Sequence, residues 1–275
     1  MKKTEIIEKY VAHVDLKYKS IKTRKIYKTR MYQFAKAHSQ LHRISSTDLK
    51  RYLFSIKEAE LSDSYFNQML AALHIIYDVI LKQPRKLDNI EYKKPKQSHY
   101  QVLTPEEIKK MIFLTSNLKH KMIIKLLYVL GLRSSELLNL RLQDIDRSNG
   151  QIFIRGAKGN KDRAIDIDDS VILQLENYWR EYEPKEFIIE GQKGGRYSRS
   201  SVQKIVSKHQ NKIGKKIWPH LLRHSIASHM INNGVNLIKL KNFLGHKNLK
   251  TTEYYYHYIK NGGMLCDSQA LIIAA

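Results

Sequence analysis

The feature that most constrains the fold is an abrupt change of pattern between residues 82 and 105. The stretch "KQPRKLDNIEYKKPKQSHYQ" is rich in lysine, contains two prolines and has no apolar periodicity, which is typical of a linker. It is followed by "TPEEIKKMIF", in which Thr104 predicts a helix N-cap, Pro105 the first helical position and Glu107 a capping box. The sequence therefore predicts two domains, with boundaries at 1–84 for the first domain, 85–101 for a basic linker and 102–275 for the second domain.

The first domain is expected to be almost entirely helical over residues 1–82. The segment "SIKTRKIYKTRMYQFAKAH" starts with Ser20 as a cap candidate, and "LSDSYFNQMLAALHIIYDVIL" starts with a cluster of serine and aspartate. In the second segment apolar residues recur at helical spacing. Three to five short helices with basic outer faces predict a compact DNA-binding module.

The second domain is expected to be mainly helical with a small sheet. The apolar helix "KMIIKLLYVLGL" ends at Gly131, and the next helix would be capped by Ser134 or Ser135. Two short extended runs in "GQIFIRGAKGNKDRAIDID" predict a β-hairpin. Further helices are predicted at 169–182, 198–213, 219–233, 236–244 and about 249–260. The fold class that follows is mainly α, with a helical first domain and a mixed α+β second domain.

The charge of the chain indicates what it binds. Lysine and arginine number 49 against 26 acidic residues, which gives a net charge of +23. Such an excess is destabilising through self-repulsion unless a polyanion neutralises it, and nucleic acid is the polyanion that best fits. A basic surface that serves only solubility is the alternative.

Several classes of protein are disfavoured by composition. The sequence has no run of about 18 apolar residues, so it predicts no transmembrane span. The N-terminus "MKKTEIIEKY" lacks the apolar region of a signal peptide. The single cysteine, Cys266, excludes an internal disulfide framework and a cysteine-built metal cluster. We therefore expect a cytoplasmic protein without a membrane partner.

Two arginines are candidates for binding an anion. Arg133, in "GLRSSELLNL", follows an apolar helix face, where a charged residue either faces a cleft or interacts with the helix dipole. In "WPHLLRHSIASHM", Pro219 opens a helix, and His220 and Arg223 share a face near its N-terminus, where anions bind readily.

The rest of the 219–233 helix is expected to have structural roles. Leu222, Ile226 and Met230 form the predicted buried stripe, and His220, Arg223 and Ala227 lie off it. On most helix phases His224 and His229 face away from the anion site, so packing or hydrogen bonding is their expected role. A metal site built from these histidines is disfavoured because no acidic ligand accompanies them.

Three consecutive tyrosines stand in "TTEYYYHYI", residues 251–259. Consecutive helical residues point in different directions, so at most one or two of Tyr254, Tyr255 and Tyr256 serve the same purpose. A tyrosine with a pKa of about 10 is a poor nucleophile, but it becomes useful when cations hold the charge of an attacked phosphodiester. His246, just after the helix-ending Gly245, is a further candidate for such a site.

The chain resembles the tyrosine recombinases of the phage integrase family, with the size and layout of the Xer-like simple recombinases. The resemblance covers nearly the whole chain. It rests on "GLRSSEL", "GAKGNKDR", "HLLRHSIASHM", "LGH" and "TTEYYYH", which occur in the family's order and spacing. The N-terminal helical pattern likewise resembles the family's core-binding domain, which has a SAM-like fold.

The resemblance implies a role for each residue that would contact the phosphate. Arg133 and Arg223 would clamp the non-bridging oxygens of the scissile phosphate, a task that suits their planar guanidinium groups. His220 would bond the phosphate and help to take the proton from the nucleophile, and His246 would be a further donor. Glu136 would orient the site without reacting.

The family pattern also implies the nucleophile and the general acid. Aligning "TTEYYYH" with it makes Tyr255 the nucleophile and places Tyr256 where the family usually has a smaller residue. Lys158 would protonate the leaving 5′-oxygen. Ala157 is inserted before this lysine relative to the commoner "GKGNK" form, so Lys161 is the alternative.

The function implied is site-specific DNA recombination through a 3′-phosphotyrosyl intermediate and a Holliday junction. Each transesterification conserves the phosphodiester energy, so no cofactor, ATP or metal is expected. The implied partners are double-stranded DNA recombination sites and a homo-tetramer, or a pairing with a related recombinase. The apolar tail "LCDSQALIIAA" would either dock on a neighbouring subunit or fray. The alternatives are a non-catalytic DNA-binding regulator and a tyrosine-type topoisomerase.

Overall fold

A computed structural model of the chain describes residues 1–94, 101–156, 162–253 and 255. The chain divides into two compact units, Met1–His99 and Tyr100–Ala275, and each has its own hydrophobic core. No helix in the described part of the chain is long and apolar enough to cross a membrane.

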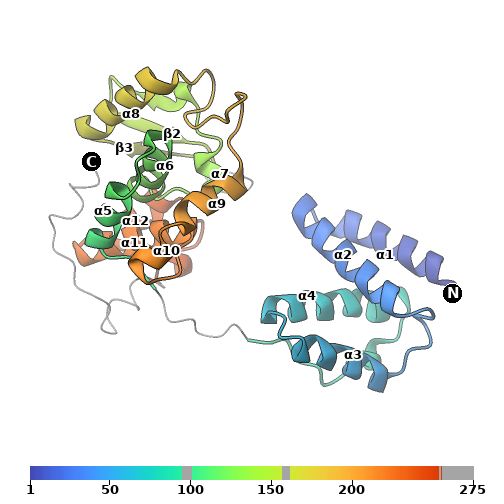
Figure 1. Ribbon diagram of the computed structural model, residues 1–275. Coiled ribbons are helices and arrows are strands. Elements are labelled where there is room, and N and C mark those ends of the chain that lie inside the picture. The colour runs from blue at the N-terminus through green and yellow to red at the C-terminus, as the bar shows by residue number, and fades with distance from the viewer. Residues whose placement is uncertain (95–100, 157–161, 254, 256–275) are drawn as a thin grey trace. The chain divides into compact units, whose positions relative to one another are not determined.

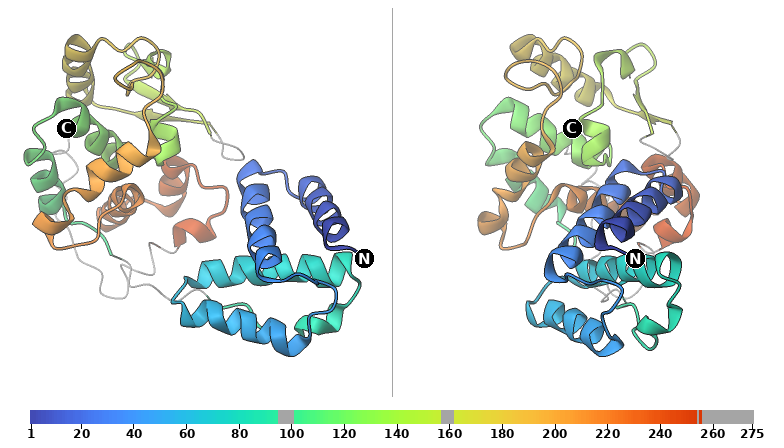
Figure 2. Two further views of the ribbon diagram at one scale, coloured as in Figure 1. Left: turned by 45° about the vertical axis from the view of Figure 1, so that its right-hand side comes forward. Right: turned by 90° about the vertical axis from the view of Figure 1, so that its right-hand side faces the viewer.

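The first unit is helical throughout its described elements (Figure 1). Helices α1 and α2 lie side by side, as do α3 and α4, and α2 packs on α4 (Figure 2). The elements are α1 (Lys3–Lys17), α2 (Ile21–Ala37), α3 (Ser46–Glu58), α4 (Asp63–His74), a π-helical turn η1 (Ile75–Ile80) and a 3₁₀ turn η2 (Pro84–Leu87).

Side-chain caps set the starts of α2 and α4. The hydroxyl of Ser20 accepts a hydrogen bond from the Thr23 amide at the start of α2, as the sequence predicts. Ser62 caps α4 in the same way, through the Tyr65 amide. Beyond η1, Leu87 is buried in the core of the first unit, so the segment assigned to the linker from residue 85 packs partly against that unit.

The second unit combines helices with one small sheet (Figure 1). Its elements are α5 (Pro105–Phe113), α6 (Leu118–Val129), α7 (Ser134–Leu137), a 3₁₀ turn η3 (Leu142–Asp144), β1 (Ile145–Asp146), β2 (Gln151–Ile154), β3 (Arg163–Asp166), α8 (Asp169–Tyr182), α9 (Arg199–Ser207), α10 (Gln210–Ile213), α11 (Pro219–Asn232) and α12 (Leu237–Leu244). The fold is mainly α with a small sheet, which confirms the predicted class.

The predicted hairpin is confirmed, and a third strand extends it. Strands β2 and β3 pair antiparallel, with Gln151 opposite Asp166 and Ile154 opposite Arg163. The short β1 adds an antiparallel edge strand that the sequence analysis missed. The predicted helix 198–213 was wrong in one respect: it is two helices, α9 and α10, separated by a turn.

Helix α11 forms the centre of the second unit and packs on α6, α9 and α12. The predicted capping box of α5 is confirmed: Thr104 and Glu107 each bond the other's backbone amide. Just before it, the backbone of Leu103 is held by α11, because its N–H donates to Ser225 Oγ and its carbonyl accepts from His229 Nε2. The segment at the start of the second unit is thereby joined to α11.

Candidate active site

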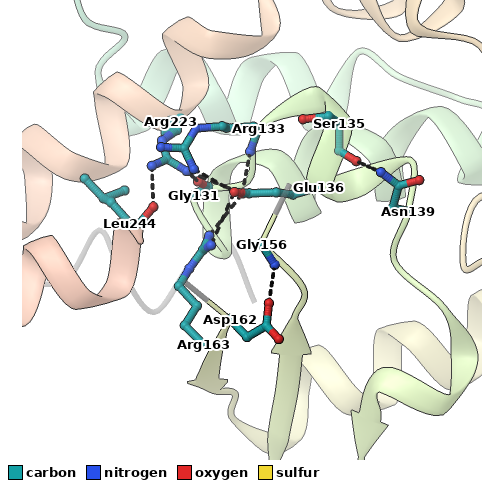
Figure 3. A network of polar contacts seen from close by, with 10 residues as sticks. All are labelled: Gly131, Arg133, Ser135, Glu136, Asn139, Gly156, Asp162, Arg163, Arg223 and Leu244. Atoms are coloured by element: carbon teal, nitrogen blue, oxygen red, sulfur yellow. Dashed lines mark hydrogen bonds and ion pairs between the residues drawn. The ribbon is translucent and has the colours of Figure 1, made fainter. Parts of the chain in front are cut away.

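The buried carboxylate of Glu136 lies at the centre of a cluster of arginines (Figure 3). Arg133 Nη1 donates to Oε1 of Glu136 at 2.7 Å, and the Arg133 amide donates to Oε2 at 3.0 Å. Arg163 donates to the same two oxygens through Nη1 and Nη2, at 3.3 and 3.1 Å. Arg223 Nη1 is 3.5 Å from Oε2. One carboxylate therefore orients three guanidinium groups from α11, β3 and the start of α7.

The cluster carries more positive than negative charge. Among these four side chains one carboxylate faces three guanidinium groups, so two positive charges are in excess. Burial alone would raise the pKa of Glu136, but hydrogen bonds and charge from Arg163, with further contributions from Arg133 and Arg223, hold the pKa below its ordinary value. Buried charge of one sign is costly unless an opposite charge accompanies it, so the cluster is suited to an anion.

Arg223 is the most constrained of the three arginines, with no side-chain surface exposed. Its Nη1 donates to the Gly131 carbonyl at 2.7 Å and its Nη2 donates to the Leu244 carbonyl. Burial and the neighbouring Arg133 lower the pKa of Arg223 to about 9, which leaves the guanidinium protonated at neutral pH. Its Nε is buried and has no hydrogen-bond partner among the described residues.

Two glycines make room for this cluster. Gly131 has a φ of +55°, and a Cβ there would lie 2.9 Å from the Phe243 ring. Gly245 has a φ of +63°, and a Cβ there would lie 2.9 Å from Arg163 Nη1. Both positions need glycine for backbone conformation and for space. The predicted helix end at Gly245 is confirmed.

The burial predicted for α11 was only partly right. Leu222 and Ile226 are buried as predicted, but Met230 is only half-buried, and Arg223 and Ala227 are also fully buried. The helix lies inside the unit with neighbours on several sides, so a single apolar stripe does not describe it. His220 retains exposed surface near the arginines.

The predicted nucleophile, Tyr255, lies against the same helix. Its side chain is 2% exposed and packs with Ala227, Leu240 and Leu244. Its hydroxyl is 2.8 Å from Nδ1 of His224, and their rings are 5.5 Å apart. The expectation that His224 faces away from the site was therefore wrong, because the buried α11 directs this residue toward the segment after α12.

His246 completes the wall around the tyrosine. Its ring is nearly parallel to that of Tyr255, with centroids 6.3 Å apart. Its Nδ1 is 3.0 Å from Thr252 Oγ1, so the second threonine of "TTEYYYH" fixes the imidazole. The buried Thr252 is a site residue for which the sequence pattern predicted no role.

The histidines of the site are neutral at neutral pH. Desolvation and the charges of Arg223 and Arg133 lower the pKa of His220 to about 4 and that of His246 to about 3. Desolvation, with His220 and Arg223 nearby, lowers the pKa of His224 to about 3. Each ring can therefore both donate and accept a hydrogen bond.

Unlike His220 and His224, His229 of α11 does not belong to the site. It is buried away from the cluster and bonds Tyr128 Oη through Nδ1 at 2.8 Å. The hydrogen-bonding role predicted for it is confirmed.

The predicted cap at Ser134 or Ser135 was wrong: Arg133 is the N-cap of α7, and Glu136 accepts from its amide. Arg163 was missed, although "GAKGNKDR" contains it; its placement depends on the β2–β3 register. Lys158, Lys161 and Ala157 lie outside the described residues, as do Tyr254 and Tyr256.

The arrangement combines a positively charged cluster, neutral imidazoles and one tyrosine hydroxyl. In the described part of the chain, no group of three or more histidine, cysteine, aspartate or glutamate side chains could hold a metal ion. The donors point instead to an oxyanion such as a phosphodiester, which guanidinium groups bind through paired hydrogen bonds.

The chain belongs to the phage integrase family, whose model matches residues 101–261. Within it the chain is a tyrosine recombinase of the Xer type. It is 31% identical over 260 residues to tyrosine recombinase XerA of Pyrococcus horikoshii, a match that covers 92% of this chain and 88% of the relative. It is 30% identical to tyrosine recombinase XerC of Staphylococcus epidermidis, with 80% and 79% covered.

Solved structures have the same fold. The XerH site-specific recombinase bound to a palindromic difH substrate aligns with a TM-score of 0.70 and 26% identity, over 86% of this chain and 77% of that one. A lambda integrase dimer bound to a core site aligns with a TM-score of 0.77 at 16% identity, over 91% and 97% of the two chains. The latter likeness concerns the fold alone.

Proposed function

We propose that this tyrosine recombinase cleaves and rejoins double-stranded DNA at specific sites, with Tyr255 as its nucleophile. The observation that carries the proposal is the convergence on α11 of an excess of guanidinium charge and a tyrosine hydroxyl. The complex of XerH with difH DNA, from a relative of the same fold, supports DNA as the substrate.

The phosphate would bind at the arginine cluster. Arg133 and Arg223 would hold the non-bridging oxygens and stabilise the charge that develops in the transition state. His220 and His246 would add hydrogen bonds. Glu136 stays ionised because of its lowered pKa, and so it would hold the arginines in place without exchanging protons.

Two transesterifications would complete a strand exchange. Tyr255 Oη would form a bond to phosphorus while the bond to O5′ breaks. His220 would help to take the proton of the tyrosine hydroxyl, and Lys158 would protonate the leaving oxygen. The 5′-hydroxyl of a partner strand would then attack the 3′-phosphotyrosine and return the tyrosine. Exchange of two duplexes requires four strand cleavages, so we propose a homo-tetramer, or a pairing with a related recombinase, on a Holliday junction.

Each part of the chain would have its own role on DNA. The helical first unit would bind DNA as a core-binding domain, with the basic segment 85–101 along the phosphate backbone and residues 102–275 as the catalytic domain. The net charge of +23 supports this assignment, because phosphate neutralisation dominates non-specific affinity. A protein that acts on chromosomal or plasmid DNA would work in the cytoplasm.

A nicked suicide substrate tests the proposal. Its site is taken from recombination junctions mapped in the host genome, and the nick lets a short fragment diffuse away so that ligation is blocked. We expect an SDS-resistant protein–DNA adduct that Tyr255→Phe abolishes and that Tyr254→Phe and Tyr256→Phe retain. An adduct that persists in Tyr255→Phe would refute the assignment, and relaxation of supercoiled DNA without exchange would favour a topoisomerase.

A further inference from the structure

The hydroxyl of Tyr255 meets His224, a residue that lies next to Arg223 on α11 and has no role in the proposal above. The distance from His224 Nδ1 to Tyr255 Oη is 2.8 Å, a normal hydrogen-bond length for these atoms. The partly buried imidazole is fixed on the other side by an edge-to-face contact with His220, at 4.6 Å between ring centroids. His224 therefore connects the nucleophile to one of the residues that would bind the phosphate.

We propose that His224 is a positioning residue that fixes the hydroxyl of Tyr255 for attack; this inference rests on the proposed role of Tyr255. A phenol oxygen rotates on an arc as the tyrosine side chain moves, and attack requires the oxygen to lie in line with the bond that breaks. The ring of Tyr255 is confined by Ala227, Leu240 and Leu244 and lies parallel to His246. The hydrogen bond to His224 then fixes the direction of the Tyr255 hydroxyl.

The environment of His224 suits a neutral residue that positions the Tyr255 hydroxyl better than a residue that takes up a proton. It lies beside Arg223, and the rings of His220 and Tyr255 pack on it. A second positive charge on α11 next to the buried guanidinium would be costly, so the imidazole stays neutral. A neutral imidazole holds the hydroxyl without adding charge to the phosphate site.

The distance from the backbone to the bonding atom of His224 suggests a pair of matched substitutions. The Nδ1 of histidine and the amide of asparagine are separated from the backbone by the same number of bonds, whereas the glutamine amide lies one bond farther out. Asparagine can donate or accept, so it can replace Nδ1 in either tautomer. His224→Asn should therefore keep the bond to Tyr255, and His224→Gln should displace it.

The test measures single-turnover cleavage of the nicked suicide substrate by the full-length protein. We expect His224→Gln to slow adduct formation by about tenfold to about a hundredfold, the range for a lost hydrogen bond and a misplaced reacting group. We expect His224→Asn to remain within about threefold of the wild type, because one neutral hydrogen bond is exchanged for another.

A second substrate separates positioning from a general structural effect. DNA ending in a 3′-p-nitrophenyl phosphate is ligated when a 5′-hydroxyl attacks phosphorus and p-nitrophenolate leaves, a reaction that needs the phosphate site but no tyrosine. Both His224 variants should ligate this DNA at near the wild-type rate. Loss of this ligation in His224→Gln, equal cleavage by both variants, or faster cleavage by His224→Gln would each overturn the inference.

Failure of the proposed function gives a different result. If wild-type protein forms no adduct that depends on Tyr255, the nucleophile itself is wrong. If wild type forms the adduct and His224→Gln forms it equally fast, only the role of His224 is wrong.

Discussion

Replacing Glu136 with glutamine should destabilise the second unit strongly, although the change removes only a charge and keeps the shape. The carboxylate is fully buried and accepts hydrogen bonds from Arg133 and Arg163, with Arg223 at 3.5 Å. Glutamine would direct an amide N–H₂ at guanidinium donors on one side. Removing one partner of a buried ion pair costs about 3–5 kcal/mol, and we expect a loss of free energy of unfolding in that range.

The assay follows from the positions of the two tryptophans in the chain. Trp179 and Trp218 both lie in the second unit, so tryptophan fluorescence during urea unfolding reports on that unit alone. For a domain of this size the same loss corresponds to a fall in Tm of roughly 6–20 °C. The matched control is Glu186→Gln, which removes a half-exposed ion pair to Arg141 and should cost less than about 1 kcal/mol.

The pH dependence gives an independent check on the same carboxylate. Because the pKa of Glu136 is lower in the folded than in the unfolded state, its charge stabilises the fold above about pH 4.5 and loses this effect as the pH falls through the folded pKa. The stability difference between wild type and Glu136→Gln should therefore narrow as the pH falls below 4.5. A variant that unfolds within about 1 kcal/mol of wild type at pH 7 would refute the role of Glu136 as the buried counter-charge of the arginines.

Three further predictions concern residues around the cluster. Gly245→Ala should lower stability by more than Gly214→Ala, since both positions have positive φ but only a Cβ at Gly245 meets Arg163; equal losses in urea unfolding would contradict this. Arg163→Lys should slow adduct formation on the suicide substrate by at least about tenfold while DNA binding changes little, because lysine cannot bond both oxygens of the carboxylate. Burial lowers the pKa of His229 to about 4, so its neutral form stabilises the fold above about pH 6.5 and this stability is lost as the pH falls. His229→Gln should remove up to roughly 2 kcal/mol of the stability change between pH 6.5 and 5, and an unchanged pH profile would argue against it.

The sequence by itself determined the fold class and most elements of the second unit. Helix starts depend on contacts within one turn, so the capping box of Thr104 and Glu107 could be predicted from residue types and spacing. The hairpin and the helix end at Gly245 are local in the same sense. The order of the motifs was enough to identify the family, which the match over residues 101–261 shows.

The tertiary structure decided which side chains meet, because these contacts join residues far apart in the chain. Arg163 reaches Glu136 from another element, and no pattern near either residue indicates the pair. The prediction that His224 faces away from the site rested on a single buried face for α11, whereas neighbours surround that helix. Spacing along the chain fixes the direction of a residue relative to its own helix, but only packing determines which residue, here Tyr255, lies in that direction.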